Sequence, residues 1–499
     1  MSRARSFWLL CSLLVACEIP EEPYPESPGP LPDPQMPDDA QAAGQVLHAV
    51  QPFALEGSQE TMTCYSWTVD NDAPLYVQDV TFQNGGSFHH SNWFVVPEDV
   101  YPGEDGFWPC AERDFNDISA ALAGTVLFAQ STQAQREAMA FTEGAVIRIP
   151  ARSKIVAGVH LLNLGPDPRE TAAWLSLDAI HPALVETILS PLMLSYRDLD
   201  IPPMTQSRFT GTCLGPANSD EPFELHYVLP HYHRTGTSAS MTVFASGEPT
   251  VVLDHEGFGA SPMGKSFDPP LSFHNVGGFE FSCSYDNPHD ESLSWGVGIH
   301  EMCVFLAFAS TTEILVGGID QGRSFSSVLD EEGVTNVAGG CSTLASPKGP
   351  AYAYPTREEI EGPLRLPPLP DEPVPEPPTC ENTEGVYEAD EPPSFEEIRS
   401  RVLEPWCSFS SCHGEAAAGG LSLVGDEARD ALVGVPSLAS DRPRVEPGDP
   451  EGSYLYHLLS ECEPQARDGA ARPMPAGAPT LLDPALVGLV RAWIEAGAL

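Results

Sequence analysis

Glu224-Leu225-His226-Tyr227-Val228-Leu229, continued by Pro230-His231-Tyr232-His233, is the stretch that decides the fold class of this 499-residue chain. Polar and apolar residues alternate through its first four positions, and the apolar run Tyr227-Val228-Leu229 follows, as in a largely buried β-strand. A similar run occurs at Ala145-Val146-Ile147-Arg148-Ile149, and turn-forming residues separate such runs. Their spacing fits two all-β, jelly-roll-like sandwiches, residues 43–190 and 191–345, better than one barrel.

The histidines at the end of this stretch have the spacing of metal ligands. Residues two apart in a strand face the same side, so His231 and His233 can approach one ion. His226 has the opposite parity and is expected to be an ordinary strand residue. A second pair, His89 and His90, is adjacent in sequence. Both side chains of that pair can reach one ion only where the strand twists or bulges.

Two candidate ligand sets follow from these pairs. Imidazole suits copper, and a thioether favours its reduced form. Two unequal copper sites indicate redox chemistry with oxygen rather than a structural metal. His300 is either a surplus ligand or an exposed strand residue. The first set is three imidazoles and the second is two imidazoles with a thioether: His89, His90 and His160, then His231, His233 and Met302.

The sequence around these residues resembles the copper type II, ascorbate-dependent monooxygenases. That family includes peptidylglycine α-hydroxylating monooxygenase and dopamine β-hydroxylase. The resemblance covers residues 45–345, and all six ligand positions hold the right residue types in the right order. It rests on His89-His90, Gly158-Val159-His160-Leu161-Leu162-Asn163, His231-Tyr232-His233, Ser282-Cys283-Ser284-Tyr285-Asp286-Asn287, Trp295-Gly296-Val297-Gly298 and Glu301-Met302-Cys303.

The resemblance implies two sandwiches of eight or nine strands that flank a solvent-filled cleft. His231, His233 and Met302 would be the catalytic set, holding the copper that binds oxygen. The copper of the other set would store and pass an electron. The implied reaction is hydroxylation of an activated C–H bond with O2, one oxygen atom leaving as water.

The resemblance also implies a disulfide framework. Cys283 would pair with Cys303 and Cys213 with Cys341, which leaves Cys64 with Cys110. A bridge beside Met302 would help to fix that ligand.

Three positions depart from the peptide-amidating members of the family. Those members place an arginine before the His-x-His pair, and an asparagine and a tyrosine after the methionine. Here the same positions are Leu229, Val304 and Leu306. Hydrogen-bonding sites discriminate more strongly than apolar ones. The sequence therefore argues against a peptidylglycine substrate and favours a less polar small molecule.

The N-terminus has the features of an export signal. Arg3 and Arg5 precede the apolar run Phe7–Ala16, which is too short to span a bilayer. Leu14-Val15-Ala16-Cys17 resembles the lipobox of bacterial lipoproteins. Residues 1–17 would then be the signal, and Cys17 the lipid-modified first residue of the mature chain. An ordinary cleaved signal with a chance cysteine is the alternative.

The expected location is the bacterial cell envelope. Glu18 follows the cysteine where an inner-membrane retention signal would have Asp, which favours the outer membrane over the inner one, and the periplasmic face is the alternative location. Residues 18–42 are rich in Pro and Glu and predict a flexible tether. No later apolar stretch is long enough for a transmembrane helix, so the membrane contact is expected to be the lipid anchor only.

The composition is strongly acidic, with a formal net charge of −47 and only three lysines. Such a chain should repel nucleic acid. A solubility adaptation explains the charge, and an acidic docking surface is the alternative. Ten cysteines remain beyond Cys17 and the signal, which fits an oxidising compartment. The six between 64 and 341 allow fifteen pairings on sequence grounds alone.

The last third of the chain changes character. Residues 346–379 are dense in Pro and acidic residues and predict an extended, semi-rigid linker. Residues 380–499 are predicted to be a mostly helical unit. Pro393–Leu403 reads as a helix that Ser394 caps, with Glu397 three residues on. Asp483–Ala496 reads as another, with one apolar face: Leu486, Leu489, Val490 and Trp493.

A Cys-x4-Cys-His segment, Cys407 to His413, begins this unit. A Cys-His pair with an upstream cysteine is the attachment motif of c-type haem, although the usual gap is two residues. With Met474 in an Arg-Pro-Met-Pro context, the order resembles small cytochrome c-like domains of planctomycete and myxobacterial exported proteins.

That resemblance implies haem c attached to Cys407 and Cys412, with His413 and Met474 as axial ligands. It also implies a Cys380–Cys462 pair. His457 is an alternative axial ligand, and a haemless domain with a Cys407–Cys412 disulfide is the alternative to haem.

The sequence thus predicts a lipid-anchored enzyme with two copper ions and haem c. Its partners would be O2, a small organic substrate and an electron donor, either an ascorbate-like reductant or a periplasmic redox protein. A tethered haem would raise the local concentration of donor. The alternative is a non-catalytic copper-binding or electron-transfer lipoprotein. A weaker reading makes the cytochrome the functional part and the sandwiches an adhesion platform.

Overall fold

The computed structural model describes most of the chain beyond residue 34. The export signal, Cys17 and most of the 18–42 tether lie outside the described residues. No helix in the described part of the chain is long and apolar enough to cross a membrane. The described residues are 35–37, 40–130, 134–215, 223–257, 263–296, 300–311, 313–369, 380–409, 412–414, 417–467, 469–476, 478 and 480–499.

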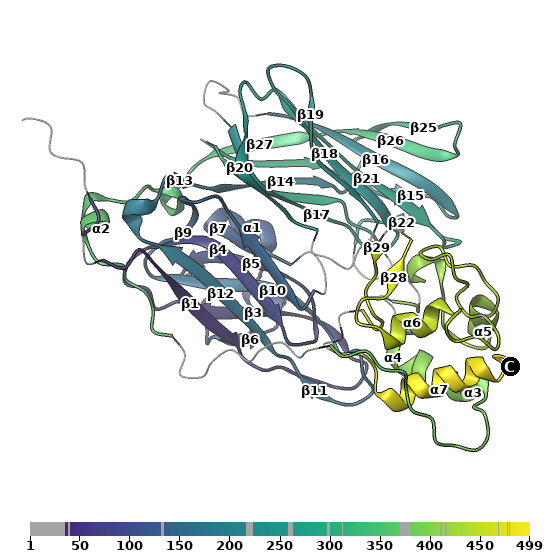
Figure 1. Ribbon diagram of the computed structural model, residues 1–499. Coiled ribbons are helices and arrows are strands. Elements are labelled where there is room, and N and C mark those ends of the chain that lie inside the picture. The colour runs from purple at the N-terminus through teal and green to yellow at the C-terminus, as the bar shows by residue number, and fades with distance from the viewer. Residues whose placement is uncertain are drawn as a thin grey trace, which may run out of the picture.

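Residues 43–188 form a β-sandwich (Figure 1). One sheet has the order β1-β12-β4-β9-β13 with β8 paired to β4, and the other has the order β6-β3-β10-β5-β7. The strands are β1 Ala43–Val50, β3 Glu60–Thr68, β4 Leu75–Asn84, β5 Phe88–Pro97, β6 Gly106–Trp108, β7 Thr125–Ala129, β8 Arg136–Ala140, β9 Ala145–Ile149, β10 Ser153–Leu162, β12 Ala173–Ile180 and β13 Thr187–Ile188, with a small β2 Ala54–Leu55 and β11 Arg169–Glu170 pair, η1 Cys110–Arg113, α1 Asp117–Ala123 and η2 Pro182–Leu184.

A second sandwich follows directly. Its sheets have the orders β20-β17-β23-β14-β24-β27 and β19-β18-β21-β16-β26-β25. Both sandwiches thus exceed the eight or nine strands that were expected. The strands are β14 Ser190–Tyr196, β16 Thr205–Leu214, β17 Phe223–His231, β18 Gly236–Phe244, β19 Thr250–Glu256, β20 Lys265–Phe273, β21 Gly278–Asn287, β23 Val304–Ser310, β24 Glu313–Ile319, β25 Ser324–Leu329, β26 Val334–Gly340 and β27 Ser342–Pro347, with a β15 Asp200–Ile201 and β22 Leu293–Ser294 pair.

The stretch that predicted a strand forms most of β17. This strand lies inside its sheet, between β20 and β23, so both edges are hydrogen-bonded. Leu225 and Val228 are fully buried, because β17 contributes to the core of the sandwich. His231 is its last residue and pairs with Val304 of β23. The strand therefore carries the His-x-His segment to the end of the sheet.

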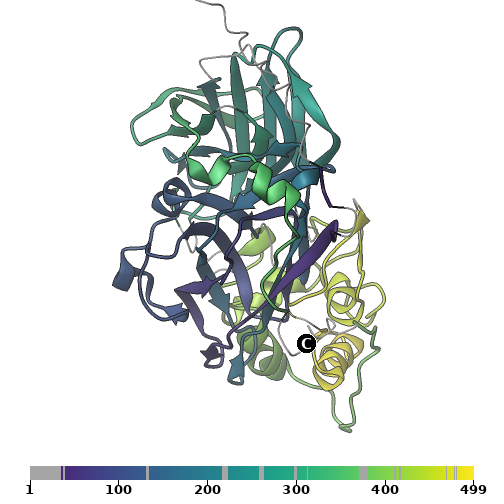
Figure 2. The ribbon, with the colours of Figure 1, turned by 90° about the vertical axis from the view of Figure 1, so that its left-hand side faces the viewer.

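The segment after β27 is not an extended linker throughout, as the sequence had predicted. Residues 350–361 form η3 Pro350–Tyr352 and α2 Arg357–Glu361. Tyr352 is buried and donates to Thr125 of the first sandwich, and the His181 ring bonds to the Gly362 carbonyl. Figure 2 shows this green segment lying across the junction of the two sandwiches. Burial of its apolar side chains outweighs the extended preference of its prolines.

The C-terminal residues form short helices around a separate apolar core. Ser394 caps α3 in a capping box with Glu397, as predicted, and Asp483 caps α7. Of the predicted apolar face of α7, Leu489, Val490 and Trp493 are buried. The elements are α3 Phe395–Ile398, a π-helical turn Arg399–Leu403, α4 Glu404–Trp406, η5 Ala418–Gly420, α5 Glu427–Leu432, α6 Tyr454–Ser460, β28 Gln465–Ala466, β29 Gly469–Ala470 and α7 Pro484–Glu495.

Four disulfides lock these units. Three lie in the sandwiches and one in the C-terminal unit, and all four pairings are those that the resemblances implied. They are Cys64–Cys110, Cys213–Cys341, Cys283–Cys303 and Cys380–Cys462.

Candidate metal centre

A β-bulge places His89 and His90 on the same side of their strand. In the pairing of β5 with β10, His160 lies opposite His90, and Leu161 lies opposite Phe88. The register therefore shifts by one residue, and His89 is the extra one. This bulge is the irregularity that the adjacent histidines required, and it brings both rings beside His160.

The first set is held together by its own side chains. The ring centroids of His89 and His90 lie 4.8 and 4.9 Å from that of His160. His160 Nδ1 lies 3.1 Å from His90 Nε2, and His160 Nε2 lies 2.9 Å from a carboxylate oxygen of Glu60. Sequence reasoning missed Glu60, because only the β3–β10 register brings it to His160.

The second set is held by the main chain. The centroids of His231 and His233 lie 5.2 Å apart. His233 Nδ1 donates to the His300 carbonyl over 2.7 Å, which leaves Nε2 as the nitrogen with a free lone pair. Met302 lies two residues after His300 in the sequence. Its carbonyl accepts from the Tyr285 hydroxyl over 2.7 Å, and the next residue, Cys303, is disulfide-bonded.

Glu301 is a second carboxylate without an assigned role in the sequence analysis. Its side chain is buried, with the residue 1% exposed. The carboxylate accepts from the His233 N–H over 2.8 Å, and from the N–H and hydroxyl of Thr235 over 2.8 and 2.7 Å. Burial raises the pKa of Glu301, and the His233 charge and these donors oppose that rise. Glu301 thereby fixes the turn that follows His231 against the segment that precedes Met302.

The two sets meet across the boundary between the sandwiches. The His90 centroid lies 5.7 Å from that of His231 and 6.5 Å from that of His233. The expectation of a solvent-filled cleft between the sets is therefore wrong for this structure. The β5 bulge and the end of β17 place the imidazoles in direct contact.

The donor chemistry of these residues fits copper. Desolvation lowers the pKa of His89 and His90 well below the ordinary value and that of His231 to about 3. These rings are therefore neutral at pH 7, the form that binds a metal. Within the described part of the chain, no three His, Cys, Asp or Glu side chains already converge as a metal site. In the first set the His160 ring nitrogens instead bond to His90 and to Glu60.

Three other histidines are engaged elsewhere. His226 bonds to the Thr142 hydroxyl through Nδ1, in keeping with its expected role as a strand residue. The His300 ring accepts from the Ser294 N–H through Nδ1, and the His300 carbonyl accepts from His233 Nδ1. Both ring nitrogens of His457 have partners, Glu461 and the Glu451 carbonyl, so an axial position would require one of these bonds to break.

The positions that depart from the peptide-binding pattern are mostly internal. Leu229 is 2% exposed and Leu306 is 8% exposed, and Val304 is half-buried. Leu229 pairs with Leu306 across β17 and β23, and both belong to the main apolar core. These residues present no polar atom to a substrate carboxylate.

The Cys-x4-Cys-His segment has the chemistry of a haem attachment site. Cys407 and Cys412 are both free thiols, so the alternative disulfide between them is absent. His413 Nδ1 donates to the Leu421 carbonyl over 2.9 Å, which leaves Nε2 available as a ligand. Burial lowers the pKa of His413 to about 4 and raises that of Cys407 to about 12. Met474 is half-buried against the core of the same unit.

This segment contacts residues that flank both histidine sets. Arg234, the residue after His233, donates to Cys412 Sγ over 3.3 Å. Phe409 packs on Leu162 and Leu164, just beyond His160. Figure 1 shows the yellow and green C-terminal unit against one end of both sandwiches.

A glycine permits this close approach. A Cβ atom on Gly165 would lie 3.1 Å from the ring of Trp406, the residue before Cys407. The first sandwich therefore accommodates the start of the Cys-x4-Cys-His segment at a position where a side chain would press on the indole.

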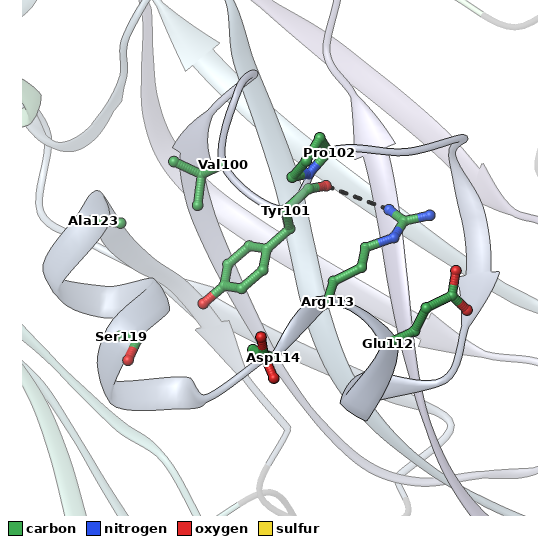
Figure 3. A pocket seen from close by; sticks show the side chains of 8 residues that line it. All are labelled: Val100, Tyr101, Pro102, Glu112, Arg113, Asp114, Ser119 and Ala123. Carbon is green, nitrogen blue, oxygen red and sulfur yellow. Dashed lines mark hydrogen bonds between the residues drawn. The ribbon is translucent and has the colours of Figure 1, made fainter.

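One surface pocket lies away from this chemistry (Figure 3). Arg113 donates to the Tyr101 carbonyl there over 3.4 Å. None of the predicted ligands lines it. Its walls are Val100, Tyr101, Pro102, Glu112, Arg113, Asp114, Ser119 and Ala123.

No protein-family profile and no curated protein matches the chain. Among solved structures, a protein of Sulfolobus turreted icosahedral virus is similar at 10% identity and a TM-score of 0.17, over 54% of this chain and 56% of the viral one. A Macrobrachium rosenbergii nodavirus protein is similar at 10% identity and a TM-score of 0.15, over 58% of this chain and 98% of that one. Likeness this weak carries no conclusion about function.

Proposed function

We propose that this chain is a copper-dependent monooxygenase that hydroxylates a C–H bond of a small organic substrate, with electrons delivered through a fused c-type haem domain. The observation that carries the proposal is the gathering of five histidines from two sandwiches beneath the Cys412-His413 loop. Four disulfides are consistent with an oxidising compartment, as in a lipid-anchored protein of the bacterial envelope.

The residues of the chain divide the work. His89, His90 and His160 would hold one copper ion, and His231, His233 and Met302 the other. Bound copper would supply one-electron redox chemistry and the activation of O2. Outside the ligands, Glu60 bonds to the His160 ring, as partners of metal-bound histidines commonly do, whereas Glu301 holds the main chain at His233.

The reaction must balance in electrons. One C–H bond and one O2 molecule, with two electrons and two protons, give one alcohol and one water. The electrons come from an ascorbate-like reductant or a periplasmic redox protein through the haem. Because Arg234, the residue after His233, donates to Cys412 Sγ, the attachment loop lies one residue from a member of the second set. Tethering keeps the donor at a high effective concentration.

The substrate is proposed to be small and weakly polar. Leu229 and Leu306 are buried where amidating enzymes carry a carboxylate clamp. An apolar wall gives little discrimination against close homologues of the substrate. A family of related small molecules is therefore a better screening set than peptides.

The test begins with metal content. The mature chain, made in a periplasm with haem-attachment machinery and supplied with copper, is expected to hold two coppers and show a haem α-band. Met302→Ala or His233→Ala should lose one copper, whereas the matched control His300→Ala should keep both. Absence of stoichiometric copper would overturn the proposal.

Oxygen uptake separates an enzyme from a carrier. With reductant and a panel of small organic substrates, uptake coupled to an alcohol product supports the monooxygenase. Bound copper without any uptake would favour the alternative, a copper-binding or electron-transfer protein. Copper without haem would remove the haem from the proposal and leave an external reductant as the donor.

A further inference from the structure

We infer that the two histidine sets form a single binuclear centre with His90 at its middle, not two sites separated by solvent. The inference rests on the proposed copper binding and adds how the ions are related. It departs from the arrangement that the family resemblance implied.

His90 is the shared member of the cluster. Its ring centroid lies 5.5 Å from that of His89, 4.9 Å from His160, 5.7 Å from His231 and 6.5 Å from His233. Every other imidazole of both sets therefore neighbours this one ring. An ion held between His231 and His233 would lie against a ligand of the other ion.

The protein holds the outer members of the cluster from opposite sides. His160 is tied to Glu60 of the first sandwich through Nε2. His233 is tied to the His300 carbonyl through Nδ1 and to Glu301 through its N–H. The His90 ring bonds to the His160 ring through Nε2. The outer rings are thus fixed to the two sandwiches, and the central ring spans the boundary.

Contacts beyond the rings hold the two sandwiches together. His226 of β17 bonds to Thr142 of the first sandwich over 2.9 Å, and Ser266 donates to the Ala140 carbonyl over 2.7 Å. Phe141 packs on Tyr227 and Phe308. Because the boundary is built from buried aromatic side chains and hydrogen bonds, the imidazole contact is part of a packed interface.

Electron paramagnetic resonance of the oxidised, copper-loaded full chain tests the inference. Two Cu(II) ions that share this cluster should couple, so the integrated spin per copper should fall well below one. His160→Ala should keep one copper, and that copper should give a full spin. His233→Ala should remove the ion of the second set, and the one remaining copper should again give a full spin. The control His274→Ala, which changes an exposed histidine directly after β20 that belongs to neither set, should keep two coppers and the low spin count.

The outcomes separate the inference from the function beneath it. Two coppers that each give a full spin would overturn the binuclear centre and leave the proposed function standing. Absence of stoichiometric copper in the folded chain, checked by circular dichroism, would overturn both. A reduced spin count that persists in the single-copper variants would also reject the inference, because it would not arise from coupling between the two sets.

Discussion

The two histidine sets are built from the same ligand type but are held by different means. His233 is bonded through its main-chain N–H and its Nδ1 to the 300–301 segment, and a disulfide follows Met302 directly. His160 is held by two side chains, His90 and the partly exposed Glu60. A ligand that the main chain or a disulfide already holds loses less conformational entropy when it binds a metal than a ligand held by mobile side chains does. The second set should therefore depend on its scaffold more than the first.

The largest expected effect comes from breaking the disulfide beside Met302. Replacing Cys283 and Cys303 together by Ala should cost about 2–5 kcal/mol of stability. It should also weaken copper binding at the second set, because the bridge ends the segment that carries Met302. Thermal unfolding and copper content measure the two effects.

The bridge Cys213–Cys341 supplies the matched control. It joins two strand ends of the same sandwich, and neither cysteine adjoins a candidate ligand. Its double Ala variant should lose stability but keep both coppers under folding conditions. Equal loss of copper in both variants would show that Cys283–Cys303 has no specific role at the site.

Glu301→Gln comes next in size. The buried carboxylate accepts three hydrogen bonds, from the His233 N–H and from the N–H and hydroxyl of Thr235. A glutamine amide has only one oxygen, so its NH2 group would face one of these N–H or O–H groups without an acceptor between them. Loss of such a partner commonly weakens metal affinity by about 10–100-fold. Copper titration should show this loss at the second set alone. Glu224→Gln, on β17, is the control and should leave both affinities unchanged.

Several features of this centre could be predicted from residue spacing. Strand parity predicted that His231 and His233 lie close together, and they do, although β17 ends at His231 and the turn after it carries His233. The adjacency of His89 and His90 required an irregular strand, and the bulge is present. The capping box at Ser394 is equally local, since both partners lie within one turn. Local geometry is readable because few residues determine it.

The rest depends on contacts between distant segments. Glu60 reaches His160 only through strand register, and Arg234 reaches Cys412 only because the C-terminal unit packs on the sandwiches. The contact of His90 with His231 likewise follows from how two cores meet. Residues 350–361 were expected to be extended, yet apolar burial orders them as helical turns.

A histidine outside both sets tests whether acid sensitivity belongs to the candidate ligands alone. Burial lowers the pKa of His226 to about 4. Between pH 6.5 and 4 the unfolded chain therefore binds a proton that the folded chain does not. The free energy of unfolding consequently decreases as the pH is lowered through this range. Allowing for screening, the effect is about 1 kcal/mol between pH 7 and pH 5.

His226→Gln should flatten this part of the stability profile in metal-free protein. The amide can still bond to the Thr142 hydroxyl, so the fold should persist. Denaturant unfolding at several pH values makes the measurement. An unchanged slope would place the acid sensitivity in other groups.

Glu60→Gln should have the smallest effect and sharpens the comparison from the other side. The Glu60 side chain is 25% exposed, and its bond to His160 is a side-chain contact that solvent can partly replace. Exposed pairs of this kind contribute about 0–1 kcal/mol. Copper affinity at the first set should therefore fall less than it does at the second set in Glu301→Gln. Titration of both variants, with His160→Ala marking full loss of the first site, compares them directly. If Glu60→Gln proved the more damaging of the two, the first set would be the more dependent on its scaffold, and the contrast drawn between main-chain and side-chain support would be wrong.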